Sequence, residues 1–168
     1  MKRTPLLFFL FLISIALIVN SCKKDNLSHI PGLLAGKWQI ASIEVYNYVG
    51  DSKISTDVLD TTCTITQYFI FNSDNSCSYV NFQCNSDTTT GRWSLTANKL
   101  FLTSDMVCND TTKSSGGTSK PFANAKIVTL GNYSLVLETG DVEPNYSATK
   151  KRRVMRYGFI RQKISSTQ

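Results

Sequence analysis

Few side chains in this sequence of 168 residues are suited to catalysis. The only histidine is His29, which precedes the first strand-like segment, so a folded domain that begins at Gly36 has no imidazole for a serine–histidine pair or a usual zinc site. Glu44 and Glu138 could form a carboxylate pair for glycoside hydrolysis, but positions on the outer face of strands account for them better. No glycine-rich phosphate loop and no CxxC pair occurs. The sequence therefore predicts a protein that is not an enzyme, with no metal and no cofactor.

Four cysteines after residue 62 form the second group of reactive side chains. Cys63 and Cys84 lie symmetrically about the turn "NSDNS" (72–76), so they would face each other across a hairpin at disulfide distance. Cys108 follows a later strand and should emerge near Cys84, which makes Cys84–Cys108 the competing pair and leaves Cys77 reduced. An even number of cysteines in an exported chain favours disulfide formation.

The N-terminus carries an export signal with a tether at its end. Lys2 and Arg3 precede the apolar run 6–19, which as a helix would cover about 21 Å and would not span a bilayer core of about 30 Å. The following "VNSC" resembles a bacterial lipobox, in which the cysteine becomes the first mature residue and carries acyl chains such as palmitate. We therefore expect a signal peptide at 1–21, a lipidated tether at 22–35 and one domain at 36–168. The expected location is the bacterial cell envelope, lipid-anchored at the outer membrane on its periplasmic or surface face.

The composition of the mature chain limits the classes of partner. Its 147 residues from Cys22 to Gln168 suffice for one ordinary domain with its own core. Removal of Lys2 and Arg3 lowers the formal net charge from +6 to +4, too mild a balance to suggest nucleic-acid binding. A basic run at 150–153 could meet anionic lipid headgroups, although a solvated loop end explains it more simply.

Strand patterns recur after Leu34 with turn residues between them, and no segment keeps a helical period. The expected strands are 37–47, 63–71, 77–84, 91–95, 99–104, 124–130, 133–139 and 152–163. The segments 49–62 and 105–121 are expected to be loops. Eight short strands in meander order predict an all-β, eight-stranded antiparallel up-and-down barrel, because closure removes exposed sheet edges.

Alternation assigns the two faces of the first and last strands. In the first strand, Tyr46 shares its parity with Trp38 and Ile40, which predicts that the three point the same way. In the last strand one face carries Met155, Tyr157 and Phe159, framed by Arg153 and Arg161.

The order of several short motifs resembles that of lipocalin-like lipoproteins of the Bacteroidota. "GKW" at Gly36–Trp38 is similar to the lipocalin G-x-W signature, and "YFIFNSDNSCSY", "GRWSLTANKL" and "LVLE" follow in the family order. The resemblance covers residues 36–163 and implies a lipocalin-like barrel. It also implies that Trp38 closes the base of the barrel beneath Arg161 or Arg156 from the last strand, through a cation–π contact. Most members of this family have no assigned activity.

Two functions from different classes remain open. The first is non-enzymatic binding of a small apolar or amphipathic ligand inside the barrel. The residues expected to line that site are aromatic: Tyr46, Phe69, Phe71, Tyr79, Trp93, Tyr157 and Phe159. The alternative is a filled structural or adhesion barrel whose loops contact a protein or glycan at the cell surface.

The tether generates a direct prediction. Replacing Cys22 by Ala removes the acylated thiol, so the protein should move from the membrane fraction to the soluble fraction when producing cells are lysed. The measurement is immunoblotting of the two fractions, with Cys77→Ala as a control that should stay with the membrane. Equal membrane partitioning of Cys22→Ala and the unmodified protein would refute the anchor.

Overall fold

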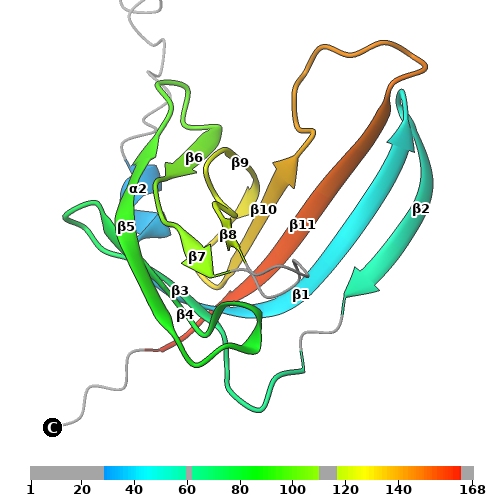
Figure 1. The fold of residues 1–168 in the computed structure, drawn as a ribbon. Coiled ribbons are helices and arrows are strands. Elements are labelled where there is room, and N and C mark those ends of the chain that lie inside the picture. Colours follow the sequence, from blue (N-terminus) through cyan, green and yellow to red (C-terminus); the bar gives the residue numbers. More distant parts are fainter. Residues whose placement is uncertain (1–28, 60–61, 110–116, 164–168) are drawn as a thin grey trace, which may run out of the picture.

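The computed structural model describes residues 29–59, 62–109 and 117–163, and their strands form a closed antiparallel barrel (Figure 1). The expected signal peptide and Cys22 lie outside these residues. The barrel strands follow one another in the order β11-β10-β9-β6-β5-β4-β3-β1, and β1 pairs again with β11. The predicted eight-stranded lipocalin-like barrel is thus confirmed. The bounds of its strands are β1 (Gly36–Val49), β3 (Tyr68–Phe71), β4 (Ser76–Val80), β5 (Thr88–Leu95), β6 (Phe101–Ser104), β9 (Ala125–Leu130), β10 (Ser134–Gly140) and β11 (Lys151–Arg161).

Some segments differ from their sequence-based assignment. The expected loop 49–62 contains β2 (Ser52–Leu59), which pairs with the outer half of β1. The signal was weak because every residue of β2 is exposed, including Ile54 (64%) and Val58 (74%), so burial imposes no alternation on it. The expected loop 105–121 contains the short pair β7 (Cys108–Asn109) and β8 (Thr118–Ser119). The expected strand 77–84 ends early, in the 3₁₀ turn η2 (Phe82–Cys84).

The pairing of β1 with β11 closes the barrel. It runs from Trp38 opposite Arg161 to Val49 opposite Lys151, and Figure 1 shows these two strands side by side with β2 beyond β1. Since β1 has 14 residues, its first part also pairs with β3 while its second part pairs with β2.

A bulge in β1 changes the predicted faces. The register against β11 shifts between Ile40 and Ser42, so parity reverses beyond that point. Val45 is therefore buried on the inner side, and Tyr46 lies on the outer wall. The expectation that Tyr46 shares a face with Trp38 and Ile40 was wrong, because one extra residue moves all later side chains to the opposite face.

The base of the barrel is closed by the short helix α2 (Ile30–Leu34) and by Arg161. Trp38 is fully buried, and its Nε1 donates a hydrogen bond of 2.7 Å to the carbonyl oxygen of Leu34. The Arg161 guanidinium lies 4.2 Å from the Trp38 ring and donates to the carbonyl oxygens of Ala35 and Leu33. Gly36 has φ +146°, and an added Cβ would collide with the Arg161 guanidinium, which explains the glycine at this position. Among the described residues, no helix has the length and apolarity needed to cross a bilayer.

This base provides a test of the fold. Arg161→Met removes the cation–π contact and two charge-assisted hydrogen bonds, so the free energy of unfolding should fall by about 3 kcal/mol. The measurement is urea unfolding followed by tryptophan fluorescence. Arg161→Lys should restore part of the loss, since the charge remains but the planar fork does not. Lys163→Met is the charge-matched control at the exposed end of the chain, and an equal effect of both Met variants would contradict this role.

Candidate functional site

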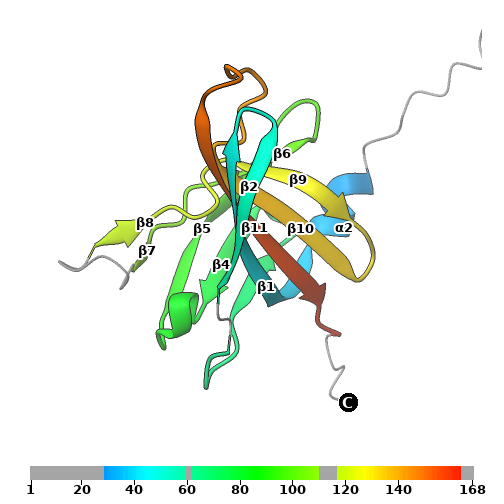
Figure 2. The ribbon, with the colours of Figure 1, turned by 90° about the vertical axis from the view of Figure 1, so that its right-hand side faces the viewer.

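A hollow of about 670 Å³ lies at the end of the barrel opposite α2. Figure 2 shows α2 on one side of the barrel and β7 and β8 on the other, where the chain leads into the loop 119–124. We call this hollow the mouth cavity. Its lining comes from the inner faces of β10 and β11, the end of β2, η2 and that loop: Thr139, Gly140, Arg153, Met155, Tyr157, Leu59, Phe82, Gln83, Ser119, Lys120, Pro121, Ala123 and Asn124.

Buried aromatic rings pack behind Tyr157, which lines the mouth cavity, and we call these rings the aromatic floor. The Phe122 ring lies 4.6 Å from the Phe69 ring and 5.1 Å from the Tyr157 ring, between centroids. The Phe69 ring in turn contacts Phe71 at 4.0 Å and Tyr79 at 5.7 Å. Phe122, Phe69, Phe71 and Tyr79 are at most 1% exposed, so side chains fill the barrel below this level. Any ligand therefore has room only above the floor.

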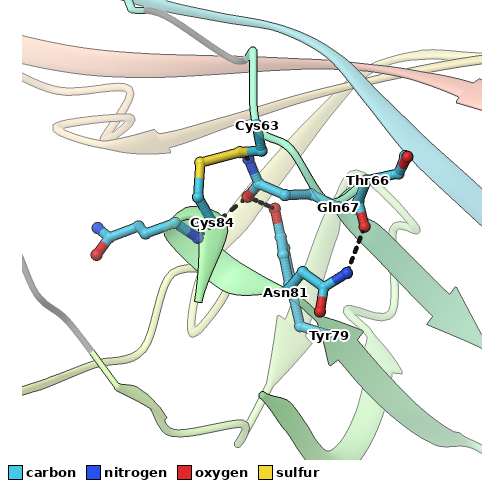
Figure 3. Close-up of a disulfide and its surroundings, with 7 residues drawn as sticks. Cys63, Thr66, Gln67, Tyr79, Asn81 and Cys84 are labelled. Carbon is cyan, nitrogen blue, oxygen red and sulfur yellow. Dashed lines mark hydrogen bonds between the residues drawn. A yellow bond between two sulfur atoms is a disulfide. The ribbon is translucent and has the colours of Figure 1, made fainter. Parts of the chain in front are cut away.

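A disulfide fixes the wall that η2 contributes to the mouth cavity. Cys63 and Cys84 are bonded, with their Cα atoms 5.4 Å apart (Figure 3). The chain reaches this bond through left-handed residues at Gln83 (φ 51°) and Cys84 (φ 63°), an unusual conformation for side chains with a Cβ. The bond therefore holds Phe82 and Gln83 in a turn that the backbone alone would not favour.

The buried amide of Gln67 connects the disulfide to the floor. Its oxygen accepts hydrogen bonds from the Tyr79 hydroxyl at 3.3 Å and from the Gln83 backbone N–H at 3.1 Å, and its nitrogen contacts the Cys63 sulfur at 3.2 Å (Figure 3). Burial raises the pKa of the Tyr79 hydroxyl far above its usual range, so it remains a neutral donor. The network is structural, since every polar group in it is engaged by a neighbour.

Charges differ between the outer wall and the mouth. On the outer wall, Glu44, Arg156, Glu138 and Lys126 lie in one row across four adjacent strands, with Arg156 and Glu138 3.3 Å apart. Glu44 accepts a hydrogen bond of 2.5 Å from the Tyr46 hydroxyl, which raises the pKa of that hydroxyl. Glu44 and Glu138 thus belong to a charge ladder with a cation between them. Within the part of the chain that the structure describes, the lining of the mouth cavity contains Lys120 and Arg153 and no carboxylate.

Comparison with known proteins places this architecture in a family. A sequence profile described as a lipocalin-like domain matches residues 34–137, which is more than half of the chain. The chain belongs to this family of lipocalin-like domains. Among solved structures, a lipocalin-like protein from Bacteroides uniformis is similar over 78% of this chain and 100% of its own, with 19% sequence identity and a TM-score of 0.42. No curated protein matches the sequence.

The aromatic residues that were predicted from the sequence to line a ligand site lie in different parts of the lipocalin-like barrel. Of these, Tyr157 lines the mouth cavity and Tyr46 lies on the outer wall. The other five are buried in the floor and the packed interior: Phe69, Phe71, Tyr79, Trp93 and Phe159. Their role in ligand contact stays a prediction, although their packing makes them part of the core.

Sequence reasoning did not single out several residues of the mouth cavity. Lys120 stood at the end of the expected loop 105–121 and Leu59 lay in another expected loop, where no alternation marks an inward direction. Phe122, which packs against the lining residue Tyr157, followed the first of these loops directly. Met155 and Arg153 did carry a signal, because they share the parity of Tyr157 on the last strand. Asn75 adopts φ 65° in the turn between β3 and β4, a left-handed conformation that asparagine tolerates.

Cys77 and Cys108, the other two cysteines among the described residues, are reduced and buried. Among the described residues, Cys84 is bonded to Cys63, so the competing prediction of a Cys84–Cys108 disulfide was wrong. Cys77 and Cys108 are both free thiols. Burial raises the pKa of Cys77 and raises that of Cys108 to about 11. Both are therefore protonated at neutral pH, which suits packing more than nucleophilic chemistry.

The disulfide can be tested by its effect on stability. It closes a loop between residues 21 positions apart, so Cys63→Ala/Cys84→Ala should lower the free energy of unfolding by about 3 kcal/mol. Urea unfolding monitored by circular dichroism measures the change. Dithiothreitol should destabilise the unmodified protein by a similar amount and leave the double variant unaffected. A shift of the double variant under dithiothreitol would point to a different disulfide.

Proposed function

We propose that this protein is a non-enzymatic, lipid-anchored binding protein that holds one small amphipathic molecule in the mouth cavity of its lipocalin-like barrel. The observation that carries the proposal is the hollow of about 670 Å³ with a mixed apolar and polar lining above a sealed aromatic floor. Pockets for small ligands commonly measure about 300–1,000 Å³ and combine apolar walls with a few polar groups. The mouth cavity matches both criteria.

The chemistry of the lining supports binding over catalysis. Apolar contacts are available from Leu59, Phe82, Met155 and Tyr157, and polar ones from hydroxyl, amide and cationic groups on the loop and strand ends. The carboxylates weighed for glycoside hydrolysis lie instead on the outer wall, separated by Arg156. The buried thiols are protonated at neutral pH.

The proposed anchor gives the mouth cavity a direction. His29 precedes α2 at the base of the barrel, and Cys22 precedes His29 by seven positions. Seven residues span at most about 25 Å, so an acylated Cys22 keeps the base within that distance of the membrane. The mouth, at the opposite end, would then open away from the bilayer. This orientation suits capture of a molecule from the surrounding aqueous phase.

The packed interior also favours a second candidate function, recognition of a glycan or protein by the outside of the barrel. A groove of about 610 Å³ on the outer wall includes Tyr48, Tyr146 and Leu100, together with Glu138 and Lys126. Much of the aromatic surface there is engaged, because Arg152 lies 3.5 Å from the Tyr146 ring and 4.8 Å from the Tyr48 ring. Binding of glycans that Tyr146→Ala abolishes, with the mouth cavity intact, would favour this alternative.

A filled-cavity variant tests the principal proposal. The uncharged fluorescent probe phenylnaphthylamine should bind the unmodified protein, and Met155→Trp should weaken binding by about 10-fold or more, because the indole occupies space in the hollow. Ile160→Trp is the matched control on the same strand, since Ile160 is 53% exposed and lies on the outer face. The measurement is fluorescence titration of the probe.

A second cavity variant keeps the proposal testable in case Met155→Trp does not fold. Leu59 lies on the exposed strand β2, where Leu59→Trp should reduce binding with little effect on the thermal midpoint. If the unmodified protein does not bind the probe, or if the two cavity variants bind it as well as Ile160→Trp does, the proposal fails.

A further inference from the structure

We infer that the ligand of the mouth cavity carries an anionic, oxygen-bearing headgroup, which Lys120 and Arg153 bind, and a single apolar tail that lies toward the aromatic floor. This inference rests on the proposed binding function and adds the chemical class of the ligand. It is drawn from the arrangement of charge around the cavity.

The two cations line the same cavity from different elements. Arg153 is at an inward position of β11, with the parity of Met155 and Tyr157, at the end of the strand that is far from the base. Lys120 lies in the loop after β8, whose place is fixed by the insertion of Phe122 into the floor. A headgroup at the rim can therefore be contacted by a guanidinium and an ammonium at once.

Two cations among the described residues have carboxylate partners, and neither is Lys120 or Arg153. Arg156 is 3.3 Å from Glu138, and Lys150 is 3.8 Å from Glu143. Within the described ranges 29–59, 62–109 and 117–163, neither Lys120 nor Arg153 forms an ion pair through its side chain.

Two acidic residues near the rim, Asp141 and Asp57, accept hydrogen bonds from neighbouring groups. Asp141 accepts the backbone N–H of Arg153 at 2.9 Å, and Asp57 accepts the side-chain amide of Asn47 at 3.0 Å. Neither lines the mouth cavity. Among the described residues, the rim thus presents positive charge with no carboxylate in its lining to repel an anion.

A third polar group adds to the rim. The hydroxyl oxygen of Ser119 is buried, lines the cavity and has no hydrogen-bond partner within the described part of the chain. A buried hydroxyl without a partner costs free energy, which an oxyanion accepting its proton would recover. Arg and Lys together favour a carboxylate or phosphate, because a planar fork and a point charge can share two oxygens.

The size of the hollow limits the rest of the ligand. Below the rim, the lining is apolar at Phe82, Met155 and Tyr157, and the floor ends at Phe122. The volume of about 670 Å³ accommodates one alkyl chain or a small ring system, and a two-chain phospholipid would need far more. The structure therefore favours a single-chain acidic amphiphile.

A pair of probes with the same tail and different headgroup charge tests the inference on the whole lipoprotein in detergent-free nanodiscs or on the chain from residue 23. Dansylaminoundecanoate and its methyl ester share a tail and differ in the charge of the headgroup. The acid should bind the unmodified protein about 10-fold more tightly than the ester. Lys120→Met/Arg153→Met should weaken binding of the acid by about 10-fold or more and change binding of the ester by less than about two-fold.

The control removes the same net charge elsewhere. Lys126→Met/Lys163→Met alters one cation of the outer wall and one that follows β11, and it should leave both probes unaffected. Equal loss in both double variants would show a diffuse charge effect and overturn the inference. Equal binding of acid and ester by the unmodified protein would also overturn it, while leaving the proposed binding function intact. Failure of both probes to bind would refute the proposed function itself.

Discussion

The antiparallel pairing of β1 with β11 is the constraint on which the remaining structure depends. These strands come from the two ends of the domain, and their register from Trp38 opposite Arg161 to Val49 opposite Lys151 turns an open meander into a barrel. The cost in chain entropy of joining such distant segments is offset only when all the intervening strands are in place. Arg161 then binds Trp38 and the carbonyl groups beside α2, so the same pairing that closes the wall also closes the base.

The bulge in β1 determines which of its later side chains lie on the inner and outer faces of the barrel wall. At the bulge after Ile40, Ser42 comes to lie opposite Gly158, where an added Cβ would collide with the Ser42 hydroxyl. The shift places the charges of Glu44 and Arg156 outside and the apolar side chain of Val45 inside. Without it, the outer half of β1 would present Glu44 and Tyr46 to the interior, and the charge ladder of the outer wall could not form.

The sequence was sufficient for the class of fold and for most barrel strands, because buried and more exposed residues alternate in β3, β4, β10 and the second half of β11. It was insufficient where alternation is interrupted or absent. The bulge in β1 leaves no trace in composition, and β2 has two exposed faces. For the candidate site, position on β11 marked Arg153, Met155 and Tyr157 in advance. Lys120 and Phe122 could not be found in this way, since a loop residue has no face until tertiary contacts assign one.

The aromatic floor leaves space for the proposed ligand only toward the rim. The Phe69, Phe71, Tyr79 and Phe122 rings fill the space that a deeper ligand would need, and removing any of them would cost several kcal/mol of packing. Some lining residues contribute less to this packing, because Leu59, Phe82 and Lys120 come from β2, η2 and a loop at the edge of the barrel. Stability and recognition therefore reside in different layers of the same barrel. Such an arrangement lets substitutions at positions such as Leu59 and Lys120 change the ligand without disturbing the closure that β1 and β11 maintain.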